Sequence, residues 1–202
     1  MPDYNNSVFV NCPFDPDYTP ILRAIIFSIY RCGFFPVTAL AEDNGLDNRL
    51  AKIERLIEGC KYGVHDLSRT ELNIHGLPRF NMPFELGIFF GAKKFGNDNQ
   101  KNKVAIILDS DENRYTEFIT DLRGIDIKAH GNNTNTAIKI IRDSLRTASR
   151  RATIPGHVII TREYNNLLAN LPDIADNLGL DINDIHFNDY CYIVEEAIKS
   201  TL

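Results

Sequence analysis

The strongest constraint on the fold is an alternation that runs along the first two thirds of the chain. Short apolar runs rich in β-branched residues alternate with longer stretches in which apolar residues recur every three or four positions. The first pattern predicts buried strands and the second predicts amphipathic helices. The predicted strands are Ser7–Cys12, Phe34–Leu40, Tyr62–Asp66, Val104–Leu108 and Ile125–Ala129, and the predicted helices are Pro20–Cys32, Asn48–Gly59, Pro83–Phe95 and Thr134–Arg151, with a short helix within Tyr115–Leu122.

Strands that are separated by crossover helices pair in parallel, and their connections are right-handed. We therefore predict an α/β domain over residues 1–152, with a five-stranded parallel flavodoxin-like sheet in the order 2-1-3-4-5. Beyond Thr153 the pattern changes to short helical stretches separated by Pro172 and Gly179. So short a region buries little surface alone, and we expect residues 153–202 to form a helical extension packed on the core. Its predicted helices are Arg162–Ala169, Pro172–Leu178 and Asn188–Thr201.

Composition excludes several classes of protein. The 22 basic and 27 acidic residues give a net charge of −5, which argues against direct binding of nucleic acid by the whole molecule. No apolar run approaches the ~18 residues of a membrane span, and the N-terminus lacks a signal-peptide pattern, so we expect a cytoplasmic protein without membrane contact. The four cysteines and five histidines show no metal-binding spacing, and no metal site is expected.

Ligands of open parallel sheets bind at the carboxyl ends of the strands, beside the point where the strand order reverses. Three segments reach that place here: Asn11–Asp15 after the first strand, Asp66–Asn81 after the third, and Pro83–Gly87 at the start of a helix. The loop Leu67–Met82 is longer than a connection of this kind needs, and loops of that length are often functional. No glycine-rich dinucleotide or P-loop motif occurs in the chain.

The two acids in these segments also have purely structural explanations. Glu85 follows the predicted helix start near Asn81 and Pro83, where the helix dipole favours an acid. Asp66 ends a strand and can cap the turn that follows it. Position alone therefore leaves both roles open.

Two further patterns have a structural and a functional interpretation. Gly87 and Gly91 lie one helical turn apart, which close packing of the helix on the sheet explains better than a ligand does. A basic stripe at helical spacing runs along the last core helix, either as a solvated face or as a contact for a phosphate or a partner. The stripe consists of Lys139, Arg142, Arg146 and Arg150.

Three segments carry a resemblance to a known superfamily. They read VFVNCPFD over Val8–Asp15, HDLS over His65–Ser68 and NMPFELG over Asn81–Gly87. Over about residues 7–151 the chain resembles the superfamily of nucleoside 2-deoxyribosyltransferases and bacterial TIR-like NAD-cleaving domains. This resemblance implies N-glycosidic bond chemistry, with Glu85 as the catalytic glutamate and Asp66 as the acid that orients the substrate. It also implies an antiviral effector that works as a homo-oligomer under a regulatory protein or signal.

The residue types suit this chemistry. Cleavage between ribose C1′ and a base builds positive charge on the sugar, which a carboxylate can stabilise or trap as a glycosyl ester. We therefore predict cleavage of NAD or a related nucleotide or nucleoside as substrate, without a separate cofactor and with Glu85 and Asp66 as catalytic residues. The predicted substrate-binding residues are Asn11, Pro13, Phe14, Ser68, Arg79 and Asn81.

Two alternatives stay open at this point. A nucleotide sensor or assembly adaptor of the same fold would keep the cleft but perform no reaction. A receiver domain would use Asp66 as its phosphoacceptor, with Asp15 or Asp17 and Lys128 beside it. Receivers place paired acids directly at the end of the first strand, where this chain has Asn-Cys-Pro, which argues against the second alternative.

Overall fold

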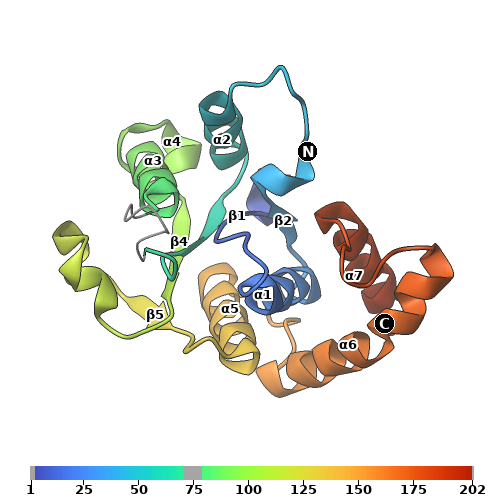
Figure 1. Ribbon diagram of the computed structural model, residues 1–202. Coiled ribbons are helices and arrows are strands. Elements are labelled where there is room, and N and C mark those ends of the chain that lie inside the picture. The colour runs from blue at the N-terminus through green and yellow to red at the C-terminus, as the bar shows by residue number, and fades with distance from the viewer. Residues whose placement is uncertain (1–2, 71–78, 202) are drawn as a thin grey trace.

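The computed structural model describes residues 3–70 and 79–201 of the chain, and its ribbon is shown in Figure 1. At the centre lies a parallel sheet with the strand order β2-β1-β3-β4-β5. This arrangement confirms the predicted α/β fold and the predicted strand order. The five strands are β1 (Ser7–Asn11), β2 (Phe35–Val37), β3 (Tyr62–Asp66), β4 (Val104–Asp109) and β5 (Ile127–Ala129).

Helices cover both faces of this sheet. The core helices are α1 (Thr19–Arg31), α2 (Arg49–Glu58), α3 (Asn81–Phe95), α4 (Asp98–Lys101) and α5 (Thr134–Ser149). α1 and α5 lie on one face, and α2 and α3 lie on the other, with α4 beside α3 (Figure 1). Because successive side chains of a strand point to opposite faces, Val8 and Val10 join the apolar cluster under α1, whereas Phe9 joins the cluster under α2.

Several predicted elements are shorter in the structure. β2 ends at Val37 rather than at Leu40, because the Thr38 side chain accepts the backbone N–H of Leu40 and starts a 3₁₀ turn. The predicted helix within Tyr115–Leu122 is instead a pair of 3₁₀ turns. The 3₁₀ turns are η1 (Tyr4–Asn6), η2 (Ala39–Ala41), η3 (Arg114–Glu117) and η4 (Thr120–Leu122).

The helical extension packs on α1 and α5, and it has fewer and longer helices than predicted. It consists of α6 (His157–Leu178) and α7 (Phe187–Thr201), and Pro172 lies inside α6. The predicted break at Pro172 is wrong, since α6 continues through this residue. Leu171 and Ala175, on either side of the proline, are both buried, and their burial offsets the backbone hydrogen bond that the proline removes. Among the described residues, no helix is both long and apolar enough to cross a membrane.

The basic stripe on α5 is partly structural. The Arg142 guanidinium donates to the carbonyl oxygen of Pro155 at 2.7 Å and also faces Asp143, and Lys139 pairs with the same carboxylate. Arg150 ends the helix with a left-handed backbone, at φ 59°. Arg142 therefore holds the connection between α5 and α6 rather than standing free for a partner.

Candidate functional site

Two adjoining pockets open at the carboxyl end of β1, between α2 and α3. The narrower one is also lined by Arg49 and Ile53 of α2. The wider one measures about 210 Å³ and shares Arg49, Ile53, Asn81 and Glu85 with the first, so Glu85 stands where the two meet. Six of the eight predicted site residues line the narrow pocket, namely Asn11, Pro13, Phe14, Arg79, Asn81 and Glu85.

Glu85 lies two residues further from the start of its helix than the sequence suggested, which places it beyond the first turn. α3 begins at Asn81, and no acid occupies its first turn. Because the effect of the helix dipole fades beyond the first turn, it does not account for this glutamate. The side chain is 11% exposed, and Arg49 approaches it only to 4.0 Å between Nη2 and Oε1. Burial raises the pKa of Glu85, and Arg49 offsets only part of that rise.

Asn11 positions the helix that carries Glu85. Its side-chain amide donates to the carbonyl oxygen of Met82 at 2.9 Å and to Nδ1 of His65 at 3.1 Å. Both amide hydrogens are therefore used to join the end of β1 to the first turn of α3 and to β3. A Cβ on Gly63 would come within 2.6 Å of the His65 ring, so only glycine fits beneath that ring.

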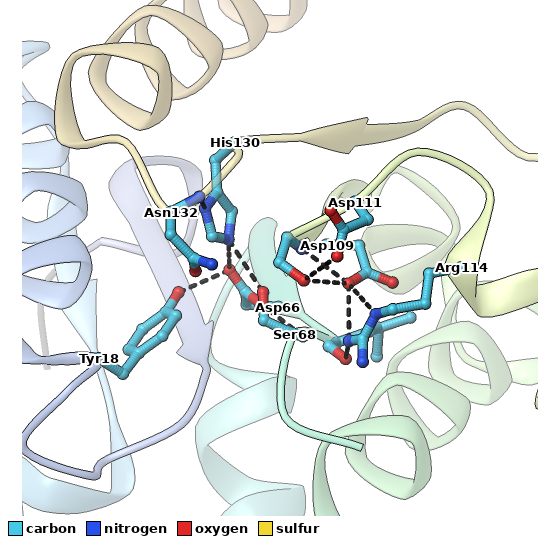
Figure 2. Close-up of polar contacts among 10 residues, drawn as sticks. Tyr18, Asp66, Ser68, Asp109, Asp111, Arg114, His130 and Asn132 are labelled. Carbon is cyan, nitrogen blue, oxygen red and sulfur yellow. Dashed lines mark hydrogen bonds and ion pairs between the residues drawn. The ribbon is translucent and has the colours of Figure 1, made fainter. Parts of the chain in front are cut away.

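Asp66 lies in a different environment, in a buried polar cluster (Figure 2). Its Oδ1 accepts hydrogen bonds from the backbone N–H of Ser68 at 2.8 Å and from the Ser68 hydroxyl. Its Oδ2 accepts from the Tyr18 hydroxyl at 2.6 Å and faces Nε2 of His130 at 3.0 Å. Burial alone would raise the pKa of Asp66, but the hydrogen bonds from His130, Ser68 and Tyr18 outweigh it and lower the pKa.

The tautomer of His130 follows from its neighbours. Its Nδ1 accepts the backbone N–H of Asn132 at 3.0 Å, so the neutral ring carries its hydrogen on Nε2 and donates it to Asp66 and Ser68. A ring in this state has no free nitrogen to take a proton from the serine. The Ser–His–Asp set is therefore not arranged for nucleophilic catalysis, and it instead ties the loop after β3 to the loop after β5.

A second anchor holds the same loop from the side of β4 (Figure 2). The Arg114 guanidinium donates to the Asp109 carboxylate at 2.8 Å and to the carbonyl oxygen of Leu67 at 2.9 Å. Further along, Arg69 pairs with Asp15 at 3.2 Å, which links the loops after β3 and β1. Residues 71–78 of the predicted functional loop lie outside the described residues.

The structure thus divides the predicted site residues into two groups. Asp66 and Ser68 are absent from the lining of both pockets and belong to the buried cluster with Tyr18 and His130. Sequence reasoning missed Tyr18, His130 and Arg49. His130 could have been found, because it directly follows the fifth strand at the same edge of the sheet.

This arrangement gives less support to a receiver domain or to a metal site. Lys128 donates from Nζ to the Ser144 hydroxyl of α5 at 2.9 Å, and Asp66 has its oxygens filled by four donors, so neither is placed as in a receiver domain. In the part of the chain that the structure describes, no three His, Cys, Asp or Glu side chains gather as metal ligands would.

No family model matches the chain, and no curated protein matches its sequence. The resemblance to the deoxyribosyltransferase and TIR-like superfamily therefore depends on the three quoted segments.

Proposed function

We propose that the protein cleaves the N-glycosidic bond of a nucleotide or nucleoside, with NAD among the candidate substrates and Glu85 as the catalytic residue. The observation that carries this proposal is the position of Glu85 at the junction of two pockets, where the described residues bring no ion pair closer to its carboxyl group than Arg49 at 4.0 Å. On the resemblance, we assign the protein to cytoplasmic antiviral effectors that deplete a nucleotide.

The walls of the pockets suit the parts of such a substrate. Leu50, Ile53 and Phe84 give the wider pocket apolar surface against which a flat base can pack. Arg49 and Arg79 bring positive charge to the narrower pocket, which suits a phosphate. The wider pocket is smaller than the roughly 300 Å³ at which sites for drug-sized ligands begin. It would therefore enclose a base and its sugar, with the rest of a dinucleotide outside.

The reaction needs only groups that this site holds and a water molecule. As the bond between C1′ and the base nitrogen breaks, its electron pair leaves with the base, and positive charge develops on the sugar. The Glu85 carboxylate stabilises that charge or forms a glycosyl ester, and water then adds to C1′ and releases a proton. Nicotinamide leaves NAD as a neutral base, so no strong general acid is required.

Replacement of Glu85 by glutamine tests the proposal directly. The variant keeps the shape of the side chain and removes its charge, and we expect base release from NAD or from a 2′-deoxynucleoside to fall by about 100-fold or more. Free base is measured by chromatography. Glu54→Gln, on the exposed side of α2, removes the same charge away from the pockets and should leave base release unchanged.

The same experiment separates an enzyme from a sensor. If the wild-type chain binds a nucleotide in a calorimeter but releases no base, and Glu85→Gln binds equally well, the protein is the non-catalytic sensor and the proposal is wrong. If base release in Glu85→Gln equals that of the wild type, the glutamate is not the catalytic residue.

A further inference from the structure

α3 is apolar on two opposite sides. Its inner side buries Met82, Leu86 and Phe89 against the sheet. Its outer side carries Phe84, Gly87, Gly91 and Phe95 at helical spacing, and the two phenylalanines are 58% and 86% exposed. We call these four residues the glycine face. No charged residue occurs in Leu86–Ala92, and Lys94 borders this face only in the last turn. The central part of the face therefore lacks the polar character that a solvated helix surface usually has.

The two glycines on this face are not explained by packing within the chain. The prediction that they pack on the sheet is wrong, because a Cβ built on Gly87 or Gly91 meets no described atom within 4 Å. Glycine in a helix interior costs about 1 kcal/mol relative to alanine. Two positions without a side chain, one turn apart, allow the backbone of another helix to approach closely.

We propose that a second copy of this chain docks on the glycine face through its own α3, in antiparallel orientation. The spacing supports this occupant, since Phe84 precedes Gly87 by three residues and Phe95 follows Gly91 by four. Read in reverse, the pattern matches itself to within one residue, so each phenylalanine meets a phenylalanine and each glycine meets a glycine. A two-fold interface requires such a self-complementary surface.

The exposed apolar area is of the order that a dimer needs. A typical stable interface buries about 800 Å² on each partner, and one phenylalanine can bury about 150–250 Å². Phe80 continues the glycine face one turn before Phe84, and Leu50 of α2 borders it; they are 67% and 43% exposed. Together with Phe84 and Phe95, these side chains supply more than half of the required area.

Docking there would also complete the candidate site. Phe84 and Leu50 line the wider pocket beside Glu85 and are exposed on its outer side, so a second copy would cover its opening. This part rests on the proposed function, whereas the dimer itself does not. We therefore infer that base release rises with the fraction of dimer.

The first test replaces both glycines by alanine. Because alanine fits at both positions and is the better helix former, Gly87→Ala/Gly91→Ala should raise the melting temperature of the monomer. The added methyl groups hold the two helices apart, so sedimentation equilibrium should show a dimer dissociation constant at least about tenfold higher than that of the wild type. Equal dissociation constants, or a wild-type chain that is monomeric at all concentrations, would overturn the proposal.

A second pair of variants tests the ends of the glycine face. Phe95→Glu places a charge on the face but outside both pockets and should abolish the dimer. Val158→Glu changes another strongly exposed apolar residue, on α6, and should leave the dimer intact. When Phe84→Cys and Phe95→Cys chains are mixed and oxidised, antiparallel helices should give a disulfide between the two variants, because Phe84 of one copy then faces Phe95 of the other. Disulfides that form only between two copies of the same variant would overturn that orientation.

The two proposals fail in different ways. If the dimer behaves as expected but no form releases base, the interface stands and the proposed function is wrong. If Phe95→Glu abolishes the dimer while base release per chain is unchanged, the claim that docking completes the site is wrong.

Discussion

Asp66 and Glu85 are two buried acids near the same edge of the sheet, and their surroundings are opposite. Asp66 is fully buried, and four hydrogen-bond donors fill its two carboxylate oxygens. Glu85 borders two pockets, and the nearest cationic group that the structure describes lies 4.0 Å away. The pKa is lowered for Asp66 and raised for Glu85, because burial acts on both but only Asp66 has donors that compensate for it.

This difference indicates which acid can perform chemistry. A carboxylate that already accepts four hydrogen bonds has no lone pair left for a substrate, and moving it would break a network that joins the loops after β3 and β5. A buried carboxylate with few partners at a pocket wall lowers the stability of the fold, and a functional role would explain why it is there. In our proposal Asp66 therefore holds the loops after β3 and β5 together, and Glu85 acts on the substrate.

Asp66→Asn is expected to have the largest effect on stability and tests the structural role of this acid directly. An amide has one oxygen, so at least two of the four donors would face its NH₂ group. We expect the free energy of unfolding to fall by about 3 kcal/mol, as measured by denaturant titration. Base release per folded molecule should stay within about twofold of the wild type.

Two outcomes for this variant can be told apart with a matched control. Tyr18→Phe removes only one of the donors and should cost less stability than Asp66→Asn. If Asp66→Asn unfolds like the wild type but loses base release, Asp66 has the substrate-orienting role that the resemblance implies, and our distinction between the two acids is wrong.

His65 extends the contrast to a base, because it is buried and pairs with no acid among the residues that the structure describes. Burial, with a smaller contribution from Lys103, lowers the pKa of His65 to about 3. Below the ordinary pKa of 6.5, the histidine of the unfolded chain therefore takes up a proton that the buried ring of the folded chain does not. The contribution of neutral His65 to stability is full above pH 6.5 and is lost as the pH falls toward 3. At about pH 5 this loss amounts to about 2 kcal/mol.

Denaturant unfolding at about pH 7.5 and about pH 5 measures this effect. In His65→Gln the acid-induced loss should shrink by most of that amount, because the titrating ring is gone while an acceptor for the Asn11 amide remains. An equal loss in the variant and the wild type would show that other groups dominate the acid sensitivity.

Most of the fold could be predicted from local patterns, because strand and helix periodicities reflect which side of each element is buried. β3 was predicted with the bounds that the structure shows, and the strand order followed from the crossover helices. Pro172 could not be judged locally, since its helix is held by packing against α1. The outward direction of Gly87 was equally hidden, because α3 is apolar on both sides.

The candidate site was predictable to the extent that it follows from topology. Six predicted residues share one pocket because the ends of β1 and the start of α3 meet at the same edge of the sheet. The separation of Asp66 from that pocket depends on Tyr18 and His130, which lie 48 and 64 positions away along the chain. The sequence of the segment around Asp66 does not indicate these contacts.

The smallest expected effect belongs to Arg49, which is the only cation among the described residues that pairs with Glu85. Arg49→Gln removes the one influence that lowers the pKa of Glu85, so the acidic limb of the pH profile for base release should move to higher pH. The Arg49 side chain is 64% exposed, and water screens its charge, so the rate near neutral pH should change by less than about twofold. Arg162→Gln removes the same charge from an exposed position on α6 and should leave the profile in place. A shift toward lower pH in Arg49→Gln would mean that the acidic limb reports a group other than the Glu85 carboxyl.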